Sequence, residues 1–169
     1  GQEILRSKSL DRNSYDSGDW FNRLDWSLRD NGFGAGLPPA GENRVAWPWM
    51  KPLLANRTIK PGPREIAWTR DATLDLLRIR ASSNLFRLRH ADDVRQRLRM
   101  LDTGPDQIGS VVAAHLDGSG LAGAGFAELL YAINVDTTSH SLSLPAERGR
   151  DWRLHPVHRR PDAADRRAA

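Results

Sequence analysis

Cysteine is absent from this 169-residue sequence, and lysine is scarce, at three residues against 22 arginines. The lack of cysteine excludes disulfides, thiolate metal sites and thiol nucleophiles, although it leaves the compartment open. No apolar run approaches the roughly 20 residues of a transmembrane helix, so the sequence predicts no membrane partner. Gly1–Arg6 (GQEILR) has neither an initiator methionine nor a signal-peptide pattern. We therefore expect the chain to begin in mid-protein or after processing, and its localisation stays undecided.

Charge of one sign is not concentrated anywhere in the chain. The 25 basic residues are nearly balanced by 21 acidic ones, which gives a net charge of +4. Nucleic-acid binders usually gather their basic excess on one face or along one helix. The alternation of Arg95, Arg97 and Arg99 would suit phosphate contacts, but a solvated strand face is the simpler interpretation. We therefore predict no nucleic-acid partner.

The first 63 residues show little regular patterning. Residues 1–30 are polar and rich in turn formers, and residues 31–63 include 11 glycines or prolines, which disfavours a regular element. A loop of this length in a compact domain is usually functional or disordered. We predict an ordered loop, because disordered segments are poor in aromatic residues. Four of the six tryptophans lie in or beside it, namely Trp20, Trp26, Trp47 and Trp49.

Regular elements are predicted for most of the remaining chain. Residues 64–80 carry apolar side chains at helical spacing, from Ile66 to Ile79, without glycine or proline. The apolar period then changes to that of strands, with turn-forming residues between them. We expect antiparallel strands at 94–101, 108–116 and 128–135, a weak one at 139–144, and a short one at 151–155. The charged tail 159–169 is expected to form a frayed helix or to be disordered.

Common catalytic and cofactor motifs are missing. The five histidines lack the spacing of a zinc site. The stretch Gly32–Gly36 (GFGAG) lacks the preceding strand and following helix of a phosphate-binding loop, and no GxSxG nucleophile motif is present. The sequence therefore predicts no metal ion and no cofactor.

One segment, Asp11–Asn22, is dense in polar and aromatic side chains. Sugars are recognised by such sets, because vicinal hydroxyls pair with planar Asp, Asn and Arg groups while aromatic faces cover C–H patches. A loop held by local side-chain-to-backbone bonds explains the same residues equally well, so both interpretations stay open. The residues concerned are Asp11, Arg12, Asn13, Tyr15, Asp16, Asp19, Trp20 and Asn22.

The sequence of this region resembles one family closely. GQEILRSKSLDRNSYDSGDWFNRLDWS (Gly1–Ser27) is similar to the segment after the eighth barrel strand of pullulanase-type and limit-dextrinase-type debranching enzymes of the α-amylase superfamily. The resemblance continues through SSNLFRL (82–88), DTGP (102–105), YAINV (131–135) and LHPV (154–157). It thus covers nearly the whole chain, about 1–158.

The resemblance implies a mixed α and β fold. Residues 1–84 would be the tail of a (β/α)8 barrel, with its eighth βα-loop and one amphipathic helix. Residues 85–158 would be an incomplete antiparallel β-sandwich-like C-terminal domain, and residues 159–169 a charged tail. The family cleaves α-1,6 branch points with retention, which needs two carboxyl groups about 5–5.5 Å apart. Its catalytic carboxylates are expected upstream of Gly1, so no catalytic residue is assigned in this chain.

By the same resemblance, the eighth loop would bind substrate at the carboxyl-terminal face of the barrel. Arg12, Asn13 and Asp16 would line glucose subsites, and Asp19 and Trp20 would bind substrate or shape the loop. The family often has Asp where this chain has Asn13. The implied partners are a branched α-glucan and the rest of the chain's own barrel.

The function indicated is that of the C-terminal part of a debranching glycosidase, inactive by itself. Three alternatives remain open at this point. One is a stand-alone α-glucan-binding module that uses the four tryptophans, and another is a structural role in which the β-domain stabilises the barrel. The third is nucleic-acid binding through Arg95, Arg97 and Arg99.

Overall fold

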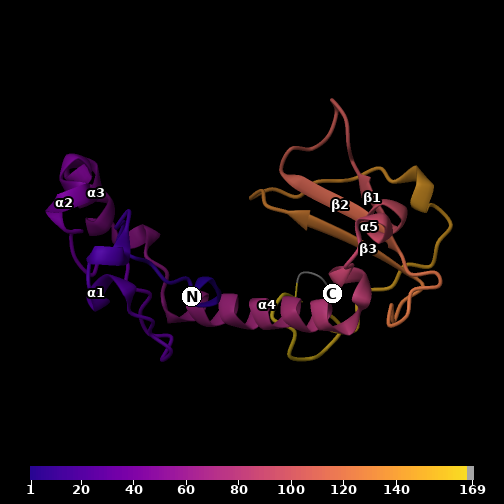
Figure 1. Ribbon diagram of the computed structural model, residues 1–169, viewed down its shortest axis with the longest axis horizontal. Coiled ribbons are helices and arrows are strands. Elements are labelled where there is room, and N and C mark those ends of the chain that lie inside the picture. The colour runs from indigo at the N-terminus through magenta and orange to yellow at the C-terminus, as the bar shows by residue number, and fades with distance from the viewer. Residues whose placement is uncertain (167–169) are drawn as a thin grey trace. The chain divides into compact units, whose positions relative to one another are not determined.

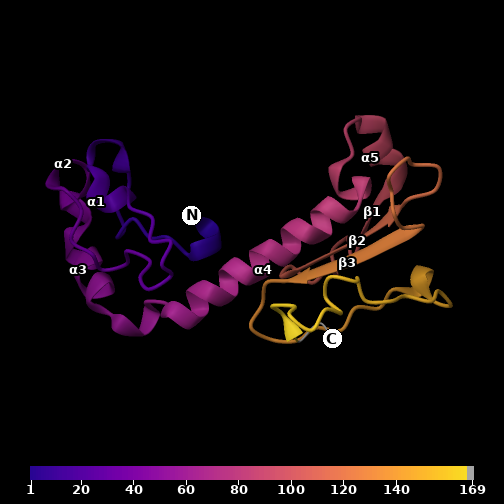
Figure 2. The same cartoon turned by 90° about the horizontal axis from the view of Figure 1, so that it is seen from below.

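The computed structural model describes residues 1–166 as two compact units. Unit 1 comprises residues 1–75 and 160–166, and unit 2 comprises Leu76–Arg159. Figures 1 and 2 show their elements from two directions. The helices are α1 (Asp19–Asn22), α2 (Ala40–Asn43), α3 (Trp47–Ala55), α4 (Pro63–Ser82) and α5 (Ala91–Arg97). The strands are β1 (Leu98–Leu101), β2 (Val111–Asp117) and β3 (Glu128–Asn134). The mixed α and β fold class is confirmed.

Unit 1 consists mainly of loops and short helices around a small core. Its buried apolar side chains include Ile4, Met50 of α3 and Ile66 of α4. Residues 31–63 contain α2 and α3, so the prediction that no regular element forms there is wrong. Pro48 lies in the first turn of α3, where no intrahelical N–H bond is lost. Pro52 lies inside the helix, where a proline removes one such bond.

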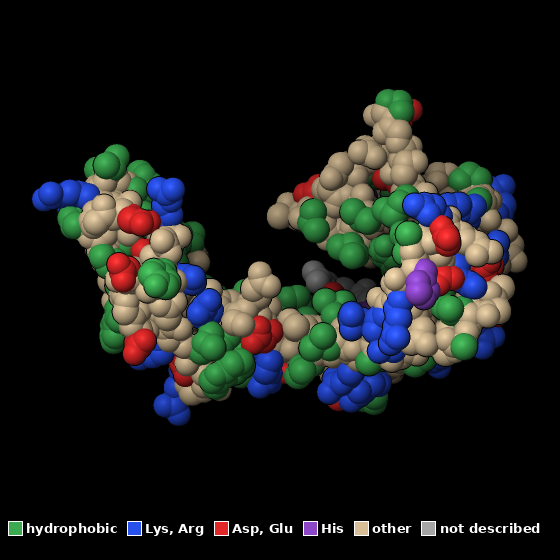
Figure 3. Space-filling view, in the orientation of Figure 1, with side chains coloured by type: hydrophobic (Ala, Val, Ile, Leu, Met, Phe, Trp, Pro, Cys, Tyr) green, Lys and Arg blue, Asp and Glu red, His purple; other side chains and the backbone are tan. Residues whose placement is uncertain are grey.

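Helix α4 confirms the helix predicted for residues 64–80 and extends it to Ser82. It begins with Pro63, whose fixed φ suits a first helical turn. Only part of the predicted apolar face is covered: Ile66 is fully buried, whereas Leu74, Leu76 and Leu77 are 41, 63 and 55% exposed. The helix therefore presents an uncovered apolar surface, and Figure 3 shows hydrophobic side chains at the surface of both units.

Unit 2 is built on one antiparallel sheet with strand order β1-β2-β3. In its register Leu98 lies opposite Leu116, and Leu116 lies opposite Leu129. These three leucines share one end of the sheet with the buried cluster of Leu85 and Ala124. The strands predicted at 108–116 and 128–135 are confirmed with small shifts of their ends.

The strand predicted at 94–101 is wrong in its first half. Residues up to Arg97 belong to α5, and only β1 is extended. Acidic residues in the first turn of α5 and basic residues in its last turn favour the helix electrostatically. Arg97 also lies 3.5 Å from the Asp93 carboxylate, one helical turn away. Arg95, Arg97 and Arg99 therefore do not form one strand face.

The strands predicted at 139–144 and 151–155 are also wrong, because neither range is extended in a ladder. Within the described residues unit 2 thus has three strands rather than five. The tail predicted to be frayed or disordered forms turns over residues 159–166. Ala163 is buried, and the amide of Ala164 donates to Oδ2 of Asp75 at 2.8 Å. The last three residues of that prediction, 167–169, lie outside the described residues.

Candidate functional site

A buried polar pair, Asp11 and Asn43, anchors the candidate loop, residues 11–22. The Asp11 carboxylate is 8% exposed and accepts a hydrogen bond from Nδ2 of Asn43 at 2.9 Å. The same Asn43 amide donates to the carbonyl of Pro39 at 3.1 Å, and its Oδ1 accepts from the backbone N–H of Arg12 at 3.3 Å. The position of Arg12 is therefore fixed through α2, 31 residues further along the chain.

The chain turns sharply just before this pair. Ser9 and Leu10 both have positive φ, 52° and 66°, a region that costs non-glycine residues roughly 1–2 kcal/mol each. Ser9 is 1% exposed, and its hydroxyl donates to the carbonyl of Gly36 at 2.6 Å. Backbone strain is retained where surrounding contacts enforce it. Here the hydrogen bonds of Ser9 and Asp11 enforce the strained backbone conformation.

Asn13 acts as a local cap for the 3₁₀ turn Ser14–Asp16. Its Oδ1 accepts from the backbone N–H of Tyr15 at 3.3 Å, and its carbonyl accepts from the hydroxyl of Ser17 at 3.3 Å. Its side chain is therefore partly used by the loop itself. Asp16, at the end of the same turn, is exposed and makes no hydrogen bond or ion pair with the residues that the structure describes.

Asn22 closes the loop from its other end. Its Nδ2 donates to the carbonyls of Ser14 and Gly18, at 2.8 and 3.2 Å. The carbonyl of Asn22 in turn accepts from the guanidinium of Arg6 at 3.2 Å. Between Asn13 and Asn22, α1 begins at Asp19, whose side chain is exposed. The backbone of the segment is thus cross-linked at both ends, while the side chains of Arg12, Asn13, Asp16 and Asp19 are exposed to solvent.

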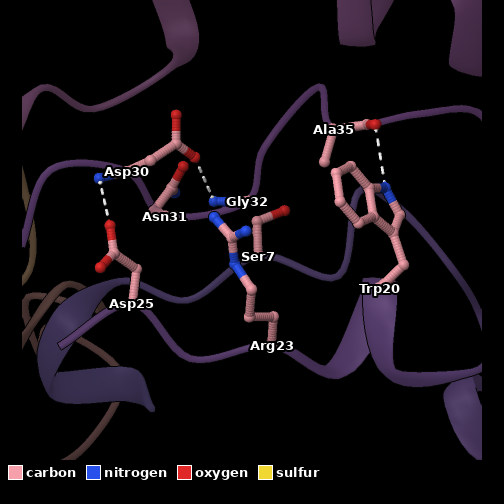
Figure 4. A pocket seen from close by; sticks show the side chains of 8 residues that line it. All are labelled: Ser7, Trp20, Arg23, Asp25, Asp30, Asn31, Gly32 and Ala35. Atoms are coloured by element: carbon pink, nitrogen blue, oxygen red, sulfur yellow. Dashed lines mark hydrogen bonds between the residues drawn. The ribbon is translucent and has the colours of Figure 1, made fainter. Parts of the chain in front are cut away.

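Trp20 lines a small pocket in unit 1, shown in Figure 4. Its indole N–H donates to the carbonyl of Ala35 at 3.1 Å, and the guanidinium carbon of Arg23 lies 5.8 Å from its ring centroid. The indole is 59% exposed. The cavity volume of about 40 Å³ holds only a few water molecules. It is too small for a sugar ring, so a ligand at Trp20 would meet the outer ring surface. The lining residues are Ser7, Trp20, Arg23, Asp25, Asp30, Asn31, Gly32 and Ala35.

Two carboxylates at this pocket are committed to loop structure. Burial by itself would raise the pKa of Asp30, but hydrogen bonds from Lys60 Nζ (2.5 Å) and the Gly32 amide (2.6 Å) outweigh it and lower the pKa. The hydroxyl and amide of Ser27 lower the pKa of Asp25. Both groups are ionised near neutral pH, so neither is suited to donate a proton to a leaving group.

The structure brings the predicted residues together only in part. Arg12, Asn13 and Asp16 share one exposed turn, whereas Trp20 belongs to the pocket and Asp19 does not line it. Asn43 is not among the residues predicted from the sequence. Its contact with Asp11 joins residues 32 positions apart in the sequence. Asn43 could have been found only by asking which side chain serves as the buried polar partner of Asp11.

A cluster of metal ligands and a membrane-spanning helix are both absent from residues 1–166, the part of the chain that the structure describes. No group of three or more His, Asp or Glu side chains there is placed to hold a metal ion. Within the same range, no helix has both the length and the apolar character needed to cross a membrane.

Comparison with known proteins identifies a consistent set of relatives. A family model described as alpha-1,6-glucosidases, pullulanase-type, C-terminal, matches residues 28–169. Pullulanase 1, chloroplastic, of Arabidopsis thaliana is 46% identical over 164 residues, which is 93% of this chain and 17% of the relative. A Klebsiella pneumoniae pullulanase is 37% identical over 150 residues, 85% of this chain and 13% of the relative. The chain thus spans less than a fifth of either relative.

Solved structures agree with these sequence matches. Ligand-free PulA of Klebsiella pneumoniae superposes with a TM-score of 0.82 at 32% identity, over 94% of this chain and 15% of that one. A maltotriose complex of a PulA variant gives a TM-score of 0.83 at 32% identity, over 94% of this chain and 17% of that one. The similarity therefore extends over both units at the level of sequence and of backbone.

Proposed function

Because the chain belongs to the pullulanase-type α-1,6-glucosidases, through their C-terminal part, we propose that it is the C-terminal part of a starch-debranching glycoside hydrolase. The proposed substrates are pullulan, amylopectin and limit dextrins, cleaved with retention. In this proposal residues 1–84 complete the catalytic barrel, residues 85–158 form the C-terminal β-domain, and residues 159–169 are a charged tail. The chain supplies a substrate-binding loop but no catalytic carboxylate.

The exposed turn Arg12–Asp16 supports the substrate-binding role most strongly. Its side chains offer a guanidinium donor and a carboxylate acceptor, the two groups that pair with neighbouring sugar hydroxyls. The backbone below them is fixed by the Asp11–Asn43 pair. A site of this kind loses little conformational entropy on binding, because its loop is ordered beforehand.

The absence of a catalytic pair among these side chains supports a non-catalytic role for the chain alone. Retaining glycosidases need one carboxyl group that stays protonated near neutral pH, usually through burial or a second carboxylate. Asp16 and Asp19 are both solvent-exposed. Neither has the burial that such a proton donor needs, so the donor has to come from elsewhere in the enzyme.

Helix α4 supports the proposal that the chain packs on the rest of a barrel. Leu74, Leu76 and Leu77 leave an apolar surface uncovered on this helix. Burying three leucines of this kind contributes several kcal/mol, since one fully buried side chain contributes about 1.5–3 kcal/mol. This surface also favours the alternative in which the chain is mainly a barrel-stabilising module. A second alternative, an independent glucan-binding module, is favoured by Trp26 and Trp49, which are 63 and 52% exposed.

Two measurements on the purified chain test the proposal. Incubation with pullulan is expected to release no reducing sugar, and release would overturn the non-catalytic role. Calorimetric titration with maltotriose is expected to show binding that Arg12→Ala and Asp16→Asn each weaken about tenfold, the loss expected for one charged hydrogen bond. Glu42→Gln, an exposed change on α2, is the matched control. Binding that depends on Trp49 and not on Arg12 would favour the independent module instead.

A chimera separates substrate binding from packing. The matching segment of the Arabidopsis relative, which is 46% identical, is replaced by this chain. We expect the chimera to hydrolyse pullulan and the Arg12→Ala change in it to lower kcat/KM with unchanged thermal stability. Unchanged kcat/KM would support the purely structural role.

A further inference from the structure

Arg23 lines the small pocket of unit 1 together with Trp20, and the proposed function does not use it. Its side chain points towards Gly32, with Trp20 on one side and Asp30 on the other (Figure 4). The guanidinium carbon lies 5.8 Å from the centroid of the Trp20 ring, within the range of a cation–π contact. Arg23 makes no hydrogen bond or ion pair with the residues that the structure describes. The five N–H donors of a guanidinium are therefore available to a ligand here.

The carboxylate oxygens at this pocket already accept hydrogen bonds. Both oxygens of Asp25 accept from the loop itself. Oδ1 of Asp30 accepts from the Gly32 amide at 2.6 Å, and its Oδ2 accepts from Lys60 at 2.5 Å. The Ser7 hydroxyl accepts from a backbone amide at 3.0 Å, but its own proton has no acceptor among the described residues. A ligand therefore meets donor groups without partners, and it has to present an oxygen atom that can accept.

The charges at the pocket balance one another. Asp25 and Asp30 supply two negative charges among the lining side chains. Arg23 supplies one positive charge, and Lys60, which is paired with Asp30, supplies the other. A charged ligand group such as a phosphate would add an uncompensated charge, whereas a hydroxyl adds none. The pocket is therefore suited to the hydroxyl oxygen of a neutral ligand.

The size of the pocket selects one part of a glucose unit. A cavity of about 40 Å³ accommodates a few water molecules and no sugar ring. The ring hydroxyls of glucose are attached directly to the ring, whereas its hydroxymethyl group carries O6 one carbon further out. This group can therefore reach the Arg23 donors while the ring stays outside the pocket. There the ring lies against the indole of Trp20, which is 59% exposed and offers an apolar surface for C–H groups.

We propose that this pocket is a glucan subsite that binds the free hydroxymethyl group of an unbranched glucose unit, with Arg23 donating to O6 and Trp20 covering the ring. The inference rests on the proposed function, because it takes the ligand to be an α-glucan. At an α-1,6 branch point O6 carries a second sugar ring, which the pocket cannot hold. The subsite therefore rejects the branched glucose unit, and this rejection helps to place the branch point elsewhere in the enzyme.

Calorimetric titration of the purified chain with two sugars tests the subsite. The probes are maltotriose and an analogue that lacks the O6 hydroxyl on each glucose unit. We expect the unaltered chain to bind the analogue about tenfold more weakly, the loss expected for one hydrogen bond to a charged group. Arg23→Ala should weaken maltotriose binding by the same factor and leave binding of the analogue unchanged. Equal affinity of the unaltered chain for both sugars would overturn the subsite, and this comparison requires no variant to fold.

Two further variants and a tryptophan signal make the test specific. Arg29→Ala removes an exposed arginine that does not line the pocket, and it should leave both affinities unchanged. Trp20→Ala should weaken both sugars alike, because the indole contacts the ring and not O6.

The indole N–H signal of Trp20 should shift when maltotriose is added. If maltotriose binds without this shift and Arg23→Ala does not weaken it, the subsite is wrong while substrate binding at Arg12 stands. If the chain binds no maltotriose at all, the proposed substrate-binding role and the subsite are both wrong.

Discussion

Asn84 and Gly123 are bound to each other so closely that position 123 has no room for a side chain. The backbone N–H of Asn84 donates to the carbonyl of Gly123 at 2.9 Å, and Nδ2 of Asn84 donates to the carbonyl of Ala122 at 2.9 Å. The neighbouring Ser83 hydroxyl donates to the carbonyl of Ala124 at 2.5 Å. Ser83 and Asn84, directly after α4, thus hold the loop between β2 and β3 in place.

Gly123→Ala is therefore expected to destabilise unit 2. Gly123 has a φ of +72°, and an added Cβ would overlap the Asn84 amide. Gly120→Ala is a matched control, because Gly120 has a similar φ of +67° and open space around it. We expect about 1–2 kcal/mol of lost unfolding free energy for the control, from backbone strain alone, and a further 1–3 kcal/mol for Gly123→Ala from steric overlap. Urea unfolding measures both, and equal losses would contradict the close contact with Asn84.

Asn43→Ala is expected to loosen the candidate site. The change leaves the buried Asp11 carboxylate and the Arg12 amide without this partner, a loss of about 1–3 kcal/mol. Maltotriose binding should weaken together with unfolding stability. Asn56→Ala serves as the control, because Asn56 caps an exposed 3₁₀ turn elsewhere in unit 1. If Asn43→Ala leaves binding and stability at the level of this control, the pair does not position Arg12.

His155 is expected to make unit 2 less stable in acid. Burial, and secondarily the charge of His158, lowers the pKa of His155. Its Nδ1 accepts from the amide of Val157 at 3.2 Å, so the proton sits on Nε2, 3.1 Å from the Ser82 hydroxyl. A lowered histidine pKa favours the neutral form in the folded state. The stability it contributes is therefore present above the unfolded value of about 6.5 and is lost as pH falls towards the folded pKa.

The measurement is the unfolding free energy from pH 8 to pH 5. His155→Asn keeps an acceptor near Val157 but cannot titrate, so its curve should be flatter than that of the unaltered chain. His158→Gln should raise the pKa of His155, as followed by NMR, because it removes a nearby positive charge. A higher folded pKa than unfolded pKa for His155 would contradict the prediction.

The exposed pair of Asp136 and His140 should respond at much lower pH. The hydrogen bond with His140, followed by that from the Thr137 amide, lowers the pKa of Asp136 to about 2. Its stabilising effect is present above the unfolded pKa of about 3.8 and is lost as pH falls through about 2. His140→Asn should move the pKa of Asp136 upward in a carbon-13 carboxyl titration. An unchanged titration would show that the pair does not form in solution.

The sequence predicted those elements whose signal is local. Helix α4 has a long run of helix formers behind Pro63, and β2 and β3 are rich in β-branched or apolar residues. Residues 94–97 were misassigned because arginine alternation matches a strand, whereas the charge order along α5 favours a helix. Helix α3 was not predicted because it contains two prolines, although Pro48 lies in the first turn, where a helix tolerates proline.

The side chains of the candidate site could be predicted from the sequence, but the contacts that hold its backbone could not. Arg12 and Asp16 are conspicuous in the sequence because they belong to a segment dense in polar and aromatic side chains. The backbone of Arg12 is held by a contact with Asn43, which lies in a helix that the sequence did not reveal. A polar contact over such a separation leaves no periodic pattern, so only three-dimensional structure can show it.

The pairing of Asp75 with Ala164 has a topological consequence. The chain leaves unit 1 after Asp75 and re-enters it at Arg160, and the bond between Asp75 and Ala164, together with that from Trp68 to the Ala164 carbonyl, holds the exit and the return side by side. Residues 76–159 are thus inserted in the sequence between two stretches of unit 1 that contact each other. Domain insertion is tolerated where the two ends of the inserted segment lie close together. A short peptide bridge from residue 75, within α4, to residue 160 should therefore let unit 1 fold without residues 76–159.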